Sequence, residues 1–174
     1  NPHVSFSIGN LEVQPYLVPH DAAEPVQYTF SDGARRLGVL TDVGSSTPFI
    51  EQTLSGCAAL VLECNHDAGM LANGDYPFSL KQRVGGRFGH LNNEEAARLL
   101  ARLDNSRLQH ILAAHLSRKN NSPGLAVRAL SAAQRYVDAI AQLKTVTRHK
   151  PELPGPWLTL GALQLELRQP RDAE

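Results

Sequence analysis

Five short stretches of the chain place a histidine or an aspartate at the end of an apolar run or at the start of a helical pattern. In the clearest stretch, Asp42 follows the apolar run 37–41 and is followed by Val43-Gly44. A carboxylate at the end of a buried strand, beside a glycine that allows close approach, is suited to holding a cation. Taken alone, such an aspartate is usually a turn former or a helix N-cap. The other four stretches contain His20, His66, His90 and His115, and the repetition favours an assembled site.

The residue types indicate metal chemistry. His20, Asp42 and His115 are ligands of the kinds that zinc and manganese accept. Their wide separation along the chain excludes a zinc finger and suits an active site built from strand ends. Cys64 and His66 lie two residues apart, but no second pair accompanies them, so a zinc site there is disfavoured. The remaining histidines are expected at surface or strand positions: His3, His110 and His149.

Length and composition limit the classes of protein that fit. A chain of 174 residues holds one medium domain, or one domain with a small appendage. The formal net charge of zero gives no global basic field, although a local basic cluster is expected from Lys81, Arg83, Arg87, Arg118 and Lys119. No apolar run is long enough to span a membrane, and the start lacks the pattern of a signal peptide. Two cysteines fit a reducing compartment, so a cytoplasmic protein is expected.

The hydrophobic pattern predicts alternating strands and helices, which is typical of an α/β layered fold. Strands are expected at 11–18, 26–30, 36–41, 58–63 and 108–114, with a hairpin turn at 31–33. Short helices are expected at 48–54, 67–72 and 77–84. The strongest helix prediction follows the N-cap pair Asn92 and Asn93, because Ala96, Leu99, Leu100 and Leu103 recur with helical spacing.

The C-terminal part of the chain has a different sequence pattern, which is helical throughout. A helical pattern runs from Pro123 to about His149, and its length leads us to expect a break near 131–135. The stretch 157–161 fits the W-x2-L-G opening of a tetratricopeptide repeat, although Gln164 stands where that pattern has tyrosine. Residues 133–174 therefore resemble a short all-α, repeat-like helical tail that offers a surface for a protein partner. A plain helical hairpin is the alternative.

Several stretches in order resemble a known family. They are Pro19-His20-Asp21-Ala22-Ala23-Glu24-Pro25, Leu40-Thr41-Asp42-Val43-Gly44, Leu62-Glu63-Cys64-Asn65-His66-Asp67, Gly89-His90-Leu91-Asn92-Asn93 and His115-Leu116-Ser117-Arg118-Lys119-Asn120-Asn121. Residues 8 to about 130 resemble the later part of a metallo-β-lactamase-fold hydrolase, and in particular its WalJ (YycJ-like) branch. The resemblance implies the C-terminal half of an αββα fold, and 5′-to-3′ exonuclease activity on DNA.

The resemblance also implies roles for individual residues. His20 would be the third histidine of one metal site, Asp42 a carboxylate that bridges two divalent ions, and His115 the last ligand of the second ion. The two ions would be zinc or manganese, and would support two-metal hydrolysis of a phosphodiester. His90 would act in catalysis by touching the substrate phosphate, together with the N-terminal amides of the helix that follows.

A further group of residues is assigned to substrate binding at the rim of the site: His66, Asp67, Arg118 and Asn120. For His66 and Asp67 the alternative is a capped turn without a role in binding. The local basic cluster favours a phosphate-containing substrate, and DNA is the expected partner.

One departure from the family is large. The His-x-His-x-Asp-His motif that supplies most of its metal ligands is absent, so residues 1–132 are expected to be a partial domain and the chain a fragment. Alone, the chain is expected to bind zinc or manganese weakly, to be inactive, and to expose a sheet edge and an apolar face. Two alternatives are a hydrolase of small esters or thioesters with the same fold, and a non-catalytic scaffold whose tail binds a partner.

Overall fold

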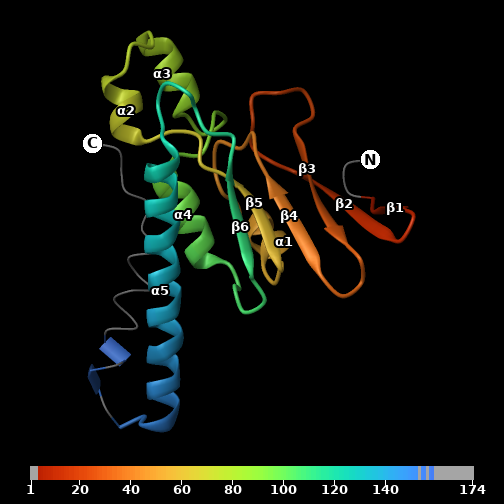
Figure 1. The fold of residues 1–174 in the computed structure, drawn as a ribbon, viewed down its shortest axis with the longest axis vertical. Helices are drawn as coiled ribbons and strands as arrows, with labels where there is room; N and C mark the ends of the chain where they lie inside the picture. Colours follow the sequence, from red (N-terminus) through yellow and green to blue (C-terminus); the bar gives the residue numbers. More distant parts are fainter. Residues whose placement is uncertain (1–3, 153, 156, 159–174) are drawn as a thin grey trace.

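The structure is a computed structural model that describes residues 4–152, 154–155 and 157–158. Its strands form one sheet in the order β1-β2-β3-β4-β5-β6 (Figure 1). These strands are β1 (Phe6–Ile8), β2 (Leu11–Leu17), β3 (Val26–Ser31), β4 (Arg36–Leu40), β5 (Ala59–Glu63) and β6 (His110–Ala114). Pairing is antiparallel from β1 to β4 and parallel from β4 to β6. The helices are α1 (Pro48–Leu54), α2 (Ala68–Asn73), α3 (Phe78–Val84), α4 (Asn93–Arg102) and α5 (Pro123–His149).

The parallel half of the sheet brings three chain segments to one edge. Leu40 of β4 pairs with Leu62 of β5, and Glu63 at the end of β5 pairs with Ala114 of β6. Because these strands run in the same direction, the residues that follow them emerge side by side. Helices α2 and α3 lie beyond these carboxyl ends, at the top of Figure 1. This edge is where the strand-end residues of the sequence meet.

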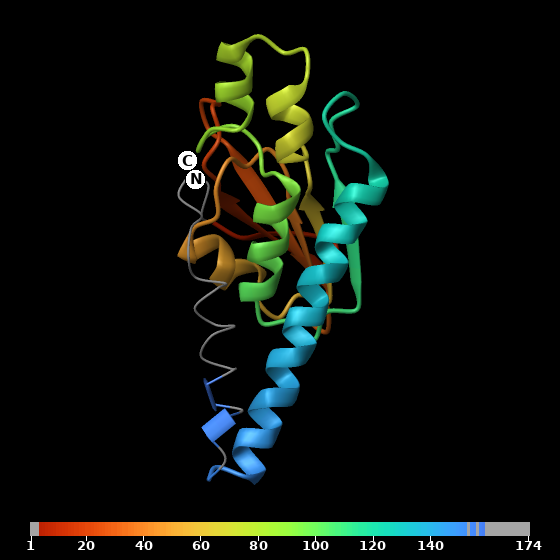
Figure 2. The ribbon, with the colours of Figure 1, turned by 90° about the vertical axis from the view of Figure 1, so that its left-hand side faces the viewer.

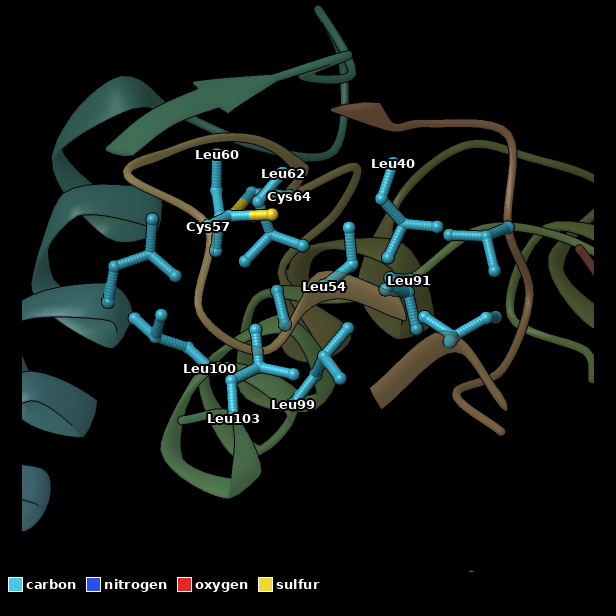
Figure 3. Close-up of a cluster of buried hydrophobic side chains, with 14 of the residues drawn as sticks. Leu40, Leu54, Cys57, Leu60, Leu62, Cys64, Leu91, Leu99, Leu100 and Leu103 are labelled. Carbon is cyan, nitrogen blue, oxygen red and sulfur yellow. The ribbon is translucent and has the colours of Figure 1, made fainter. Parts of the chain in front are cut away.

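Helices α1, α4 and α5 cover one face of the sheet (Figure 2). The core between the layers is built mainly from leucines of β5, α1 and α4, including Leu54, Leu60, Leu62, Leu99 and Leu100 (Figure 3). All five are at most 3% exposed, and burying each contributes roughly 2 kcal/mol to the hydrophobic term. This core fixes the strand ends relative to the start of α4.

The opposite face of the sheet is partly open. Val61 lies between Leu60 and Leu62, so it points away from the helices, and its partner Leu112 on β6 shares that face. Leu112 is 61% exposed, and β6 is an edge strand of the sheet. The expected open edge and exposed apolar side chains are therefore present. Among the described residues, no helix is both long and apolar enough to cross a bilayer.

Most predicted elements are present within two residues of their expected bounds, and α1 coincides with its prediction. β1 was not predicted. The expected break near 131–135 is wrong, because α5 continues from Pro123 to His149 and extends past the sheet in Figures 1 and 2. The sequence has no Gly or Pro after Gly124 in this helix, and Ala126, Leu130 and Ala133 anchor it in the core.

The proposed boundary between 132 and 133 lies inside α5 and stays a prediction. The resemblance to a tetratricopeptide repeat rests mainly on residues outside the described part of the chain. Within that part, the indole N–H of Trp157 donates to the carbonyl of Pro151 at 3.1 Å. The tail beyond α5 is therefore not assigned to a repeat.

Candidate metal centre

Asp42 and His115 occupy strained backbone positions at the ends of parallel strands. Their φ angles are 50° and 54°, and within the described chain they are the two non-glycine residues with positive φ. Aspartate and histidine tolerate this region better than most residues, but it still costs free energy. Such strain is found most often at functional sites, so Asp42 and His115 are candidate functional residues.

The carboxylate of Glu63 joins three of the converging segments. It is fully buried at the end of β5. Its Oε1 lies 2.8 Å from Nδ1 of His90 and 2.8 Å from Nδ1 of His115. Its Oε2 accepts the backbone N–H of Val43 at 2.9 Å. A buried carboxylate needs such donors to offset its lost hydration, so Glu63 holds both imidazoles and the turn beside Asp42 in place.

The hydrogen bonds also determine which ring nitrogens are free. Nδ1 of His20 lies 2.9 Å from the carbonyl oxygen of Gly89. Since a carbonyl only accepts, this Nδ1 carries the proton and Nε2 keeps its lone pair. The same reasoning applies to His90 and His115, whose Nδ1 atoms donate to the Glu63 carboxylate. Three imidazoles therefore each offer Nε2 as a ligand atom, in the arrangement that orients metal-binding histidines.

These side chains lie close together around Asp42. Its Oδ1 lies 3.9 Å from Nε2 of His20, 3.8 Å from Nδ1 of His90 and 3.4 Å from Nδ1 of His115. The ring centroids of His90 are 5.1 Å from His20 and 5.0 Å from His115. Asp42, Glu63, His90 and His115 each offer a ligand atom within 4.8 Å of the others. Carboxylate oxygens and imidazole nitrogens are the kinds of donor that zinc and manganese accept.

Glu63 differs from the other members of this cluster. Its carboxylate is fully buried and accepts three hydrogen bonds from the protein. We therefore assign it to positioning and not to ligation. Its hydrogen bond to His90 raises the pKa of that imidazole, with a smaller contribution from its charge, and partial burial opposes the rise. The His90 imidazole therefore keeps its proton to a higher pH than an ordinary histidine.

Gly44 allows two loops to close over Asp42. A Cβ added to Gly44 would lie 2.4 Å from the carbonyl oxygen of Arg87 and 2.5 Å from the nitrogen of Gly89. The Gly44 N–H donates to the carbonyl of Pro19 at 2.8 Å. Any larger residue would push the loops that carry His20 and His90 away from the cluster.

Three buried asparagines hold the backbone segments beside the cluster in place: Asn65, Asn93 and Asn121. Asn93 and Asn121 donate to each other's side-chain oxygens at 3.0 and 2.9 Å. The Asn121 amide also donates to the carbonyl of Cys64 at 2.7 Å. Asn65 donates to the carbonyl of His115 at 3.0 Å and so holds its strained backbone. Together these amides tie the ends of β5 and β6 to the start of α4.

The structure places the four predicted rim residues differently from one another. Arg118 is exposed, whereas His66 and Asn120 are each 2% exposed. The carboxylate of Asp67 accepts the N–H of Met70 at 2.8 Å and caps α2, which agrees with the alternative of a capped turn. Nδ1 of His66 and Nδ2 of Asn120 are buried and have no hydrogen-bond partner among the described residues. Their roles in substrate binding stay predictions.

His90 lies inside the cluster, so the structure is compatible with contact to either metal or substrate. The amides at the start of α4 are less available than expected. The N–H of Asn93 donates to the carbonyl of His66, and that of Glu95 donates to the Asn92 side chain.

Sequence reasoning missed Glu63 as a functional residue. The available signal was an acidic residue closing an otherwise apolar strand, since a buried charge needs partners.

The fold of the chain matches metallo-β-lactamase-fold proteins. The metallo-β-lactamase fold protein YhfI from Bacillus subtilis superposes with a TM-score of 0.58 and 17% identity, covering 76% of this chain and 48% of YhfI. Zn(2+)-bound PqqB from Methylobacterium extorquens superposes with a TM-score of 0.51 and 18% identity, covering 76% of this chain and 46% of PqqB. No family model matches the sequence.

The chain is homologous to two bacterial exodeoxyribonucleases. It is 40% identical over 125 residues to exodeoxyribonuclease YycJ of Bacillus anthracis, covering 72% of this chain and 47% of YycJ. It is 32% identical over 120 residues to exodeoxyribonuclease WalJ of Streptococcus pneumoniae, covering 69% of this chain and 45% of WalJ. The chain thus spans about half the length of the curated relatives that it matches.

Proposed function

We propose that this chain supplies part of the active site of a metal-dependent phosphodiesterase, a 5′-to-3′ exonuclease that acts on DNA in the cytoplasm. The observation that carries the proposal is the convergence of three imidazoles and the Asp42 carboxylate, with Glu63 fixing the rings of His90 and His115. The exodeoxyribonuclease names of its homologues support the choice of substrate.

In this proposal His20, Asp42 and His115 would hold two divalent ions, zinc or manganese. Bound ions of this kind would make water a nucleophile near neutral pH and neutralise the charge on the phosphate. The protein's own contribution is geometric. Glu63 and the Gly89 carbonyl accept the Nδ1 protons of His115 and His20, which leaves Nε2 of each ring as the nitrogen with a free lone pair.

His90 is assigned to the substrate phosphate. Glu63 raises the pKa of His90, so its imidazole holds a proton more readily than an ordinary histidine. A protonated or hydrogen-bonding imidazole stabilises negative charge on a phosphate oxygen. The exposed Arg118 and Lys119 lie a few residues after His115 and add positive charge nearby. These two basic side chains favour a phosphodiester substrate over a small thioester. A partner-binding role for the helical tail is proposed on sequence alone.

The test compares two variants in a protein that joins this chain to an upstream half carrying the His-x-His-x-Asp-His motif. Metal content and the rate on a 5′-phosphorylated duplex are measured together. Asp42→Asn is expected to lose both ions and activity, whereas His90→Ala is expected to keep the ions and lose activity. Loss of metal in His90→Ala would show that His90 is a ligand, and full activity in Asp42→Asn would overturn the proposal.

A further inference from the structure

Two aromatic rings near the cluster each lie close to a basic side chain. The guanidinium of Arg87 lies 5.8 Å from the ring centroid of Phe88, and the ammonium of Lys119 lies 5.8 Å from that of Tyr76. A third ring, Phe78, begins α3 and is 74% exposed, and Phe88 is 54% exposed. We call these five residues the aromatic rim. Single exposed phenylalanines such as Phe6 are ordinary, but exposed rings at both ends of α3, two of the three rim rings beside a cation, form a group suited to a ligand.

The backbone connects the aromatic rim to the metal cluster at both ends. The carbonyl of Phe88 accepts the N–H of Asp21 at 2.9 Å, between His20 and the loop that leads to His90. At the other end, Gly74 packs so closely that an added Cβ would lie 2.8 Å from Oδ1 of Asn120, beside Lys119. The rim therefore runs along α3 from the His90 loop to the loop that follows His115.

We propose that the aromatic rim binds the unpaired end of a DNA strand by stacking bases on Tyr76, Phe78 and Phe88, while Arg87 and Lys119 contact its phosphates. This inference rests on the proposed nuclease function and narrows its substrate to a frayed or single-stranded end. Aromatic faces combined with positive charge are the features that bind single strands with little sequence preference. Bases inside a duplex are stacked on one another and do not present their faces to such rings.

The chemistry of the rim favours a nucleic acid over a protein partner. Protein interfaces are enriched in aromatic residues and arginine but depleted of lysine, so Lys119 against Tyr76 is the contact that favours a nucleic acid. Each end of the aromatic rim carries a cation beside a ring, and Arg118 adds another exposed basic side chain. Two of the neighbouring acids are engaged, Asp21 in an ion pair with Arg83 at 2.5 Å and Asp67 in the cap of α2. Asp75, which precedes Tyr76, is exposed, so its charge opposes a phosphate at that end of the rim.

The test measures binding of this chain to a fluorescent oligonucleotide by anisotropy, with EDTA present so that no metal or cleavage is involved. Probes are a single strand, a blunt duplex, and a duplex with an unpaired 5′ end. The substitutions Phe78→Ser and Phe88→Ser are made together. Both side chains are exposed, so circular dichroism and melting are expected to be unchanged. The control is Phe6→Ser, since Phe6 is 46% exposed on β1 at the far edge of the sheet.

The unpaired-end probes are expected to bind at least about fivefold more tightly than the blunt duplex, and the double variant to lose that preference. The control variant is expected to keep it. Equal binding of all probes, an unaltered preference in the double variant, or no binding to any probe would overturn the inference. Because no metal is present, each of these results is separate from success or failure of the nuclease assay.

Discussion

The carboxylate of Glu63 and the imidazole of His115 are joined by a 2.8 Å hydrogen bond across 52 residues of sequence. The Glu63 side chain is fully buried and the His115 side chain is 42% exposed, so the bond fixes an accessible imidazole to the core. Because the same carboxylate oxygen also accepts a hydrogen bond from Nδ1 of His90, one buried carboxylate orients two imidazoles.

Glu63→Gln is therefore expected to weaken metal binding by about tenfold to 100-fold, the usual cost of removing a residue that orients metal ligands. An amide nitrogen cannot accept the Nδ1 protons, and one oxygen alone is left for three donors. Cobalt titrated into the chain, followed by visible absorption, measures the affinity. Glu94→Gln is the control, because Glu94 is exposed in the first turn of α4. Equal affinity of the two variants would show that Glu63 does not position the site.

Asn121→Ala is expected to destabilise the fold by about 3 kcal/mol, since it leaves several buried groups without partners. The Asn121 side chain bonds to Asn93, to the carbonyl of Cys64 and to the N–H of Ser122. Urea unfolding measures the change. Asn73→Ala is the matched control, as Asn73 is bonded at an exposed site in α2, and less than about 1 kcal/mol is expected there. A similar cost for both variants would contradict a special role for the buried asparagines.

Stability is expected to fall as the pH drops through a window set by His66. Burial, helped by the nearby His90, lowers the pKa of His66 from 6.5 to about 4. The unfolded chain then binds a proton between about pH 6.5 and 4 that the folded chain does not, so acid favours unfolding. The full effect is about 3 kcal/mol, present above pH 6.5 and lost as the pH approaches 4.

The measurement compares unfolding free energies at pH 7.5 and pH 5 for the chain, for His66→Gln and for His110→Gln. His66→Gln is expected to reduce the difference between the two pH values. His110 is exposed on β6, so its substitution is expected to leave the difference unchanged. If His66→Gln retains the full acid sensitivity, the buried neutral imidazole is not its source.

DNA binding is expected to weaken steeply with salt, because each phosphate contact releases counterions. Arg118→Ala is expected to reduce the slope of log affinity against log salt by about one contact. Arg83→Ala is expected to change the slope less, since Arg83 is already paired with Asp21 at 2.5 Å. Anisotropy titrations at several salt concentrations measure both slopes, and a larger effect of Arg83 would reverse this ranking.

Sequence patterns were sufficient to locate the strand ends that carry Asp42 and His115. A run of apolar residues before each of them predicts a strand, and parallel strands end at one edge of the sheet. The pairing of Glu63 with His90 and His115 was not predictable in this way. It depends on how three loops pack, and no local pattern records that packing. For the same reason the reciprocal contact of Asn93 with Asn121 appeared only in the structure.

The error in α5 has a different origin. The expected break rests only on the length of the helical pattern, although the interior of α5 holds no residue that stops a helix. Packing of Ala126 and Leu130 against the core stabilises its first half, and the helix then continues without a signal to end. Typical length is a weaker guide than the presence of a helix-breaking residue.

We propose that His20, Asp42 and His115 form part of a metal site whose neighbouring imidazoles are positioned by Glu63. The most direct measurement is a titration of the isolated chain and of Asp42→Asn with zinc by calorimetry. Weak but saturable binding to the chain is expected, because this chain holds only some of the roughly four ligands that each zinc takes. No detectable binding to Asp42→Asn is expected. Binding that is unchanged by Asp42→Asn would contradict this proposal.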